Sequence, residues 1–175
     1  MNPFMMRMFR AARLDRTLYE EVEQDKTATQ QAMGVVVLSS VAAGIGSVGQ
    51  VGPAGILVGT VFALGGWYIW AFLTYWIGTK FLPGPETHAD VGELLRVIGF
   101  SSSPGLIRVL GVIPGLSTIL FPAAAIWMLV AMVIAVQQAL DYPKPGRAIA
   151  VCALGWLIQI FVFGMLFALM GGPST

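Results

Sequence analysis

Charged side chains are scarce in this sequence, and cysteine and histidine are scarcer still. Asp, Glu, Lys and Arg make up 11% of the 175 residues, whereas a soluble globular domain carries about 25%. The chain has too few charges to cover a water-facing surface, so lipid must be its main solvent. The single cysteine, Cys152, excludes an internal disulfide framework, and the single histidine, His88, excludes sites built on paired histidines. The net charge of +1 excludes the concentrated basic surface of a nucleic-acid-binding protein.

Long charge-free runs indicate where the chain crosses the membrane. Residues 27–79 contain no charged side chain, and one helical crossing needs about 20 apolar residues, so this run predicts two spans. The helix breakers in residues 49–53 predict the connection between them. Two more runs flank the polar turn at 141–147. The sequence thus predicts an all-α integral membrane protein, a five-span transmembrane helical bundle over residues 31–172, with spans near 32–48, 54–81, 94–113, 117–140 and 148–170.

The segment Glu93–Pro114 is the hardest to assign, because Ser101–Gly105 interrupts its helical pattern. It is either a broken third span or a re-entrant hairpin. A crossing places nine of the ten Lys and Arg residues on the inner side, against eight of ten without it. We therefore expect a prokaryotic inner-membrane protein with a cytoplasmic N-terminus and an external C-terminus.

The N-terminal segment, residues 1–30, has the pattern of a cytoplasmic amphipathic helix. Its apolar residues fall near one helical face, and arginine recurs at positions 7, 10, 13 and 16. That apolar face consists of Phe4, Met8, Ala11, Leu18 and Val22. Two interpretations stay open: a helix that lies on the inner leaflet, or a helix packed on the protein's own loops.

Ionisable residues beside the broken third span are the candidates for a functional site, because intramembrane charges usually mark transport or catalysis. We predict a polar or ion-binding site from Arg96, Arg108, Glu93 and Ser101, with Asp141 as a further partner. Glu93 and Arg96 are three positions apart, so on a helix they can also pair with each other. The alternative is that the two arginines extend to opposite membrane surfaces. No nucleophile motif, metal-ligand spacing or phosphate-binding loop occurs, so we expect no catalytic residue, no metal and no cofactor, only bound lipids.

Small residues at four-residue spacing allow helices to approach closely in lipid. The residues expected at such contacts are Ala42, Gly46, Gly55, Gly59, Gly111, Gly115 and Gly164. The second span is crowded with aromatic side chains, more than an interfacial belt requires. We expect contacts with lipid or a partner helix, or else ordinary packing, at Trp67, Trp70, Trp76, Phe4 and Met8.

Four short segments carry a family resemblance. They are Arg16-Thr17-Leu18-Tyr19-Glu20-Glu21-Val22-Glu23, Gly66-Trp67, Leu95-Arg96-Val97-Ile98-Gly99-Phe100-Ser101 followed by Pro104, and Ala135-Val136-Gln137-Gln138-Ala139-Leu140. The pattern resembles the Yip (Ypt/Rab-interacting protein) domain family of five-span membrane proteins, in its prokaryotic-type branch. The resemblance implies that the third segment crosses the bilayer. Eukaryotic members bind prenylated Rab GTPases through an acidic, aromatic D-L-Y-G-P element that is absent here, so we do not expect a Rab-type GTPase as a partner.

The sequence supports a function without catalysis. We expect an accessory or scaffold subunit that associates laterally with other integral membrane protein subunits and with lipids, and that binds no nucleic acid. Two alternatives stay open. One is a small transporter or channel that uses the broken third span, and the other is a membrane-shaping or trafficking-type Yip protein that acts through its N-terminal helix.

Overall fold

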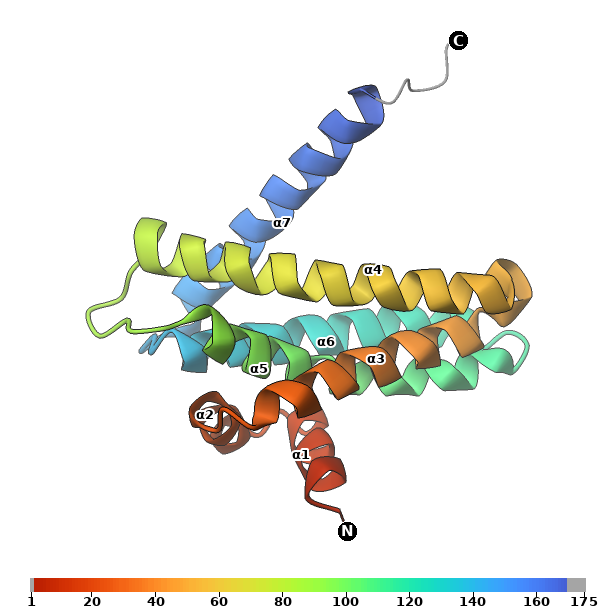
Figure 1. Cartoon of the computed structure of the whole chain (residues 1–175), viewed down its shortest axis with the longest axis horizontal. Coiled ribbons are helices and arrows are strands. Elements are labelled where there is room, and N and C mark those ends of the chain that lie inside the picture. The colour runs from red at the N-terminus through yellow and green to blue at the C-terminus, as the bar shows by residue number, and fades with distance from the viewer. Residues whose placement is uncertain (1, 170–175) are drawn as a thin grey trace.

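The computed structural model describes residues 2–169, and every regular element in that range is a helix (Figure 1). Five helical segments are long and apolar enough to cross a membrane. They are Ala28–Gly46, Gly52–Phe81, Val91–Val112, Ser117–Ala139 and Pro145–Val162. The chain is therefore an all-α membrane protein with five spans, as its charge-free runs predict.

The spans are built from α3 (Ala28–Gly46), α4 (Val48–Trp76), the third span, α6 (Ser117–Ala139) and α7 (Pro145–Leu169). A π-helical segment, η1 (Ile77–Phe81), continues α4. The helix that precedes α3, loop 82–90 and turn 140–144 lie at one end of the bundle, which we call the charged end, whereas the first N-terminal helix lies beside the middle of the bundle (Figure 1). Connections 47–53 and 113–116 form the opposite, apolar end.

The third span consists of two different helices in succession. The α-helix α5 (Val91–Ser101) is followed by the 3₁₀-helix η2 (Ser103–Val112). Pro104 lacks the amide N–H that would bind the Phe100 carbonyl in an α-helix, and the Ser103 hydroxyl donates to that carbonyl instead, at 2.7 Å. This span is also the most enclosed, with 61% of its apolar window buried against 33% or less in the other four.

The connection between α3 and α4 is short. Ser47 follows α3 directly, and Gly52, with φ 65° and ψ 175°, interrupts the helical backbone just before Pro53. A positive φ is readily adopted by glycine, and proline is favoured where a helix begins again. The membrane-spanning part of α4 therefore begins at Gly52, so that α3 and α4 run antiparallel.

The N-terminal segment forms two helices instead of the single helix that its pattern predicts. These are α1 (Pro3–Ala12) and α2 (Arg16–Gln24), which begin after the N-capping side chains of Asn2 and Asp15. The chain reverses between them at Leu14, whose φ of 61° ends α1. Leucine is rarely found with positive φ, so nothing in the composition indicates this turn.

The buried face of the hairpin packs on the protein's own helices. Leu18, Tyr19 and Val22 of α2 are fully buried, and α2 lies against α5 and α6. Figure 1 shows α1 running away from the bundle, across the direction of α3. Phe4 and Met8 are half-buried and pack against the same core, which favours ordinary packing as their role. The exposed apolar side chains of α1 are Met5, Met6 and Phe9.

Helix α7 leaves the bundle after its first turns (Figure 1). Ala148, Val151 and Cys152 are buried in this first part. The preceding turn is fixed by Tyr142, whose hydroxyl donates to the Gly78 and Leu82 carbonyls at 3.2 and 2.6 Å. Farther along α7 the apolar side chains become exposed. They include Trp156, Leu157, Ile160, Phe161 and Met165.

Candidate functional site

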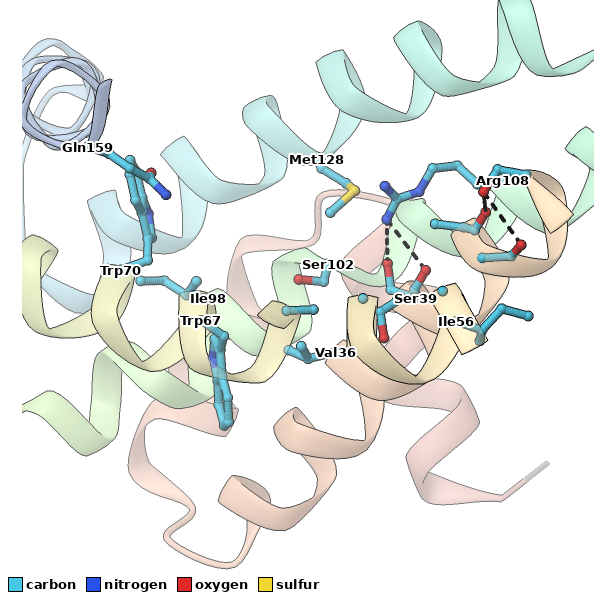
Figure 2. Close-up of a pocket in the computed structure, with 18 residues that line it drawn as sticks. Val36, Ser39, Ile56, Trp67, Trp70, Ile98, Ser102, Arg108, Met128 and Gln159 are labelled. Atoms are coloured by element: carbon cyan, nitrogen blue, oxygen red, sulfur yellow. Dashed lines mark hydrogen bonds between the residues drawn. The ribbon is translucent and has the colours of Figure 1, made fainter. Parts of the chain in front are cut away.

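A cavity of about 530 Å³ lies inside the membrane-spanning bundle, lined by α3, α4, the third span, α6 and α7 (Figure 2). The guanidinium of Arg108 and the amide of Gln159 contribute to its polar lining, and Trp67 and Trp70 supply aromatic surface. Its hydroxyl groups come from Ser39, Ser40, Ser47 and Ser102. Because these spans are otherwise apolar, this gathering of polar groups is the candidate functional site.

The face of α4 that lines the cavity carries small residues. Gly55, Gly59, Ala63 and Gly66 all contribute to its wall. A Cβ atom added at Gly59 or Gly66 would meet no heavy atom within 4 Å. The prediction that Gly55 and Gly59 form a tight helix–helix contact is therefore corrected. On this face the absence of side chains leaves open volume.

Arg108 is the cation of the cavity and has neutral acceptors as its partners. Its Nη2 donates to the hydroxyl oxygen of Ser39 at 3.0 Å, and its Nε donates to the Gly105 carbonyl at 3.1 Å. The guanidinium also lies 6.0 Å from the centre of the Phe121 ring. Figure 2 shows the side chain directed towards Ser39 and Met128.

The Arg108 side chain extends away from the nearer membrane surface. Its backbone carbonyl packs against Gly46, the last residue of α3, whereas its guanidinium contacts Ser39, seven residues earlier in that helix. At 1.5 Å per residue, Ser39 lies about 10 Å farther from the apolar end. The alternative in which Arg108 extends to the surface does not hold, because η2 aims the side chain inward.

Arg96 has a different role at the charged end. It is 5% exposed, and its guanidinium donates to the backbone carbonyls of Val22 and Glu23 in the last turn of α2. Carbonyls in the last turn of a helix lack intrahelical partners and carry the negative end of the helix dipole, so a cation is favoured there. Arg96 therefore fastens the N-terminal hairpin to α5.

The four residues Arg96, Arg108, Glu93 and Ser101 do not meet in one site. Glu93 forms a capping box with Asp90 at the start of α5, with two backbone-to-carboxylate bonds of 2.8 Å. The Ser101 hydroxyl donates within its own helix to the Ile98 carbonyl at 2.7 Å. The capping of α2 and α5 thus takes up Arg96 and Glu93, whereas Ser101 and Arg108 both line a cavity of about 270 Å³ on the α6 side of the third span.

The predicted pairing of Glu93 with Arg96 is also absent among residues 2–169. Asp141, the other predicted partner, lies in the turn before α7 at the charged end. Burial and the neighbouring Glu86 carboxylate raise the pKa of Asp141. It therefore offers no counter-charge to Arg108, which belongs to η2 near the opposite, apolar end of the bundle.

The three tryptophans of the second span have different environments. Trp67 donates its Nε1–H to the Leu95 carbonyl at 2.9 Å and so ties α4 to α5. Trp70 is 8% exposed, and its Nε1–H has no partner among the described residues. Trp76 is 46% exposed and packs edge-on against Phe81, with ring centres 4.9 Å apart. Of the three, Trp76 is the one with much surface available to lipid or a partner.

Of the other small residues predicted at helix contacts, some pack between helices and one forms a turn. Ala42 is buried on α3, and Gly46 meets Gly111 at the seam between α3 and η2, where a Cβ at Gly111 would lie 3.0 Å from the Gly46 carbonyl. Gly115 has φ 84° and forms the turn before α6, so it is not a packing residue. The surroundings of Gly164 fall outside the described residues.

Ion pairs within the N-terminal hairpin use part of its positive charge. Arg7 pairs with Glu21 and Asp25, both at 2.9 Å, and Arg10 pairs with Asp15 at 2.7 Å and Glu21 at 2.6 Å. These contacts hold α1 against α2. The basic residues at 7 and 10 are therefore occupied by carboxylates of the same hairpin.

Glu23 is the titratable group most affected by docking of the hairpin. Burial, together with the nearby carboxylates of Glu93 and Asp141, raises its pKa to about 7, and the positive charge of Arg96 opposes this shift. The Glu23 carboxyl therefore changes its charge near neutral pH.

Three residues that line the cavity, Ser39, Ser40 and Gln159, are not among the residues of the predicted ion-binding site. Ser39 and Ser40 form a polar pair in the middle of an otherwise apolar span, which is a weak signal available from the sequence. Gln159 is a polar residue in the middle of α7, and it borders the cavity. Helix directions decide which of these residues face one another, and a sequence without structure does not give those directions.

The comparison with known families agrees with this architecture. The family model described as the Yip1 domain matches residues 19–166. The chain belongs to the Yip1 domain family. The match begins within α2 and extends through most of α7, so this Yip1-domain protein is a multi-pass integral membrane protein, as its short motifs predict. Among curated proteins and solved structures, no match was found.

Proposed function

We propose that this Yip1-domain protein is a non-enzymatic accessory or scaffold protein that associates laterally with other integral membrane protein subunits. The observation that supports this is the departure of α7 from its own bundle (Figure 1). In lipid, exposed apolar surface is ordinary, but a helix that leaves its neighbours gives up the van der Waals packing that holds membrane helices together. A partner helix would restore this packing.

The face offered to such a partner is a strip of large side chains on α7. Leu154, Phe161 and Met165 recur at helical spacing and are exposed, and Phe161 is the most exposed of them at 72%. None of the three lines the apolar groove between α6 and α7, so they occupy a different face of the helix. We define these three residues as the α7 face.

We further propose that the charged end is cytoplasmic, in a prokaryotic inner membrane. Arg108 belongs to η2, in the half of the bundle nearer the apolar end, and the other nine Lys and Arg residues belong to the N-terminal segment, η1, α5, the turn before α7 and the first turn of α7. Basic residues concentrate on the cytoplasmic side of inner-membrane proteins. This assignment places the N-terminus inside and the C-terminus outside.

The test is extraction of the full-length protein directly into lipid nanodiscs, followed by mass spectrometry of proteins that co-purify. We expect a reproducible, stoichiometric membrane subunit, and we expect Phe161→Ala to reduce its recovery. Phe62→Ala on α4 is the matched control, because Phe62 is similarly exposed at 76% but lies outside the α7 face. A wild-type protein recovered alone and as a monomer would contradict the proposal.

A second candidate function, membrane shaping or trafficking of the Yip type, is supported by the family match and by α1. The exposed apolar surface of α1 consists of Met5, Met6 and Phe9, and such a surface inserts into a bilayer interface. Replacing these three residues with serine should abolish any effect of the reconstituted protein on vesicle size. Unchanged vesicles with wild-type protein would count against this function.

A transporter or channel that uses the third span receives less support. Such a function would be easiest with Arg96 and Arg108 on one path, but Arg96 binds the end of α2 and Arg108 faces the cavity. Solute flux that disappears in both Arg96→Gln and Arg108→Gln, with the fold retained, would restore this alternative.

A further inference from the structure

Acidic residues are distributed unevenly, and Arg108 is far from all of them in sequence. The nine Asp and Glu residues occur in three stretches, 15–25, 86–93 and 141. All three belong to the charged end of the bundle. No acidic residue occurs between Glu93 and Asp141, and none follows Asp141. An anion beside Arg108 must therefore come from outside the chain.

A cation in a membrane span is stable only when its charge is solvated or compensated. The contacts of Arg108 with Ser39 and Gly105 are hydrogen bonds to neutral oxygens, and no ion pair among the described residues includes it. The Arg108 side chain also does not reach water at the membrane surface, because it points to the interior of the bundle. The fold therefore holds an uncompensated guanidinium beside a cavity.

The cavity also contains a buried hydrogen-bond donor without an acceptor. Trp70 is more than nine-tenths buried, and its Nε1–H is unpartnered within the described part of the chain. Trp70 lines the large cavity and also a second one of about 270 Å³ on the α6 side, and Arg108 and Ser102 line both. Buried donors are normally satisfied, so the wall shared by the two cavities carries a donor whose acceptor the described residues do not supply.

An apolar groove lies next to the polar site. Leu129 and Trp156 line the smaller cavity and also the groove between α6 and α7. That groove is about 670 Å³ in volume and is lined by apolar side chains. The polar cavity, at about 530 Å³, lies in the range of about 300–1,000 Å³ that is typical of pockets for organic ligands.

We propose that Arg108 and the cavity beside it bind the phosphate group of an anionic membrane phospholipid, with an acyl chain in the groove between α6 and α7. The guanidinium supplies charge-assisted hydrogen bonds to phosphate oxygens. Serine hydroxyls supply further donors, and the glycine face of α4 leaves room for the headgroup. A free phosphate ion shares the polar chemistry but would leave the groove without a role. This inference does not depend on lateral association through α7.

The test is a binding titration of delipidated full-length protein in neutral detergent, followed by native mass spectrometry. The probes are dioleoyl phosphatidylglycerol, dioleoylglycerol with the same acyl chains but no phosphate, and inorganic phosphate. We expect one phosphatidylglycerol molecule to bind, and Arg108→Gln to weaken that binding by about tenfold or more. Arg16→Gln in α2 is the matched control for loss of one positive charge, and its binding should equal that of wild type.

A second variant covers the case in which Arg108→Gln fails to fold. Gly59→Leu fills the cavity from a position where a Cβ meets nothing within 4 Å, whereas Gly65→Leu makes the same change on α4 away from the cavity lining. We expect Gly59→Leu to abolish phosphatidylglycerol binding and Gly65→Leu to retain it. Retained binding in either Arg108→Gln or Gly59→Leu would overturn the site. Equal binding of dioleoylglycerol, or displacement of the lipid by inorganic phosphate, would overturn the lipid assignment.

Discussion

Arg96 and Arg108 lie in the same span, yet the two halves of that span give them opposite surroundings. Arg96 belongs to the α-helical half and is buried against backbone carbonyls at the end of α2. Arg108 belongs to the 3₁₀ half and faces an open cavity with one serine and one carbonyl as partners. The comparison teaches that an arginine in a membrane span is structural or functional according to the acceptors that the fold brings to it.

The largest effect that we expect comes from removing the structural arginine. Arg96→Met keeps much of the side-chain volume but leaves the carbonyls of Val22 and Glu23 without their charged donor, which should cost about 3 kcal/mol of folding free energy. Limited proteolysis should also show release of residues 1–26. The measurement is equilibrium unfolding in mixed micelles, combined with mapping of the cleavage sites.

The corresponding change at Arg108 tests whether the two arginines differ in their contribution to stability. Arg108→Met removes an uncompensated cation and replaces it with an apolar side chain, so lipid-free protein should keep its stability or gain up to about 1 kcal/mol. Destabilisation comparable to that of Arg96→Met would show that the two arginines do not differ as described.

A pair of glycine substitutions sharpens the contrast between the tight and open faces of the bundle. Gly46→Ala places a Cβ in steric conflict with the Arg108 carbonyl at the α3–η2 seam, so we expect a loss of about 2 kcal/mol. Gly59→Ala faces open space and should stabilise α4 by up to about 1 kcal/mol, because alanine has the higher helix propensity. The two variants are compared by thermal unfolding in one detergent, and shifts of the same sign would contradict the assignment.

The last prediction concerns pH and the docked hairpin. The pKa of Glu23 rises from 4.5 to about 7 on folding, so the folded protein holds this proton more tightly than the unfolded chain does. Its contribution to stability is present below pH 4.5 and is lost as pH rises towards 7. Glu23→Gln should flatten the pH dependence of unfolding in this window. Glu86→Gln, in the exposed loop, should not, and an unchanged slope in Glu23→Gln would count against the burial of this carboxyl.

The number of spans was predictable because it depends on where charges are missing. Charge-free runs locate hydrophobic segments, and the positions of Lys and Arg favoured a crossing third segment. The serines before Pro104 also indicated local repair of the backbone, and Ser103 supplies it at the Phe100 carbonyl. These features follow from local chemistry and need no knowledge of which helices are neighbours.

The site was less predictable because it depends on contacts between distant residues. Arg96 reaches α2, more than 70 positions earlier in the chain, and spacing within its own helix suggested a pair with Glu93 instead. The inward direction of Arg108 follows from η2, whose 3₁₀ geometry the sequence did not reveal. Likewise, four-residue glycine spacing is the same whether a face packs tightly, as at Gly46, or lines a cavity, as at Gly59.

The 3₁₀ helix has a consequence for how η2 can vary. With about three residues per turn, every third side chain lies in one straight file. Gly105, Arg108 and Gly111 therefore stand in line against α3, with the arginine between two positions that have no side chain. In an α-helix, each step of three residues would rotate the next member by about 60° off that line. The motif Gly-x-x-Arg-x-x-Gly thus matches the three-residue period of the 3₁₀-helix. An insertion or deletion of one residue would turn the arginine away from Ser39.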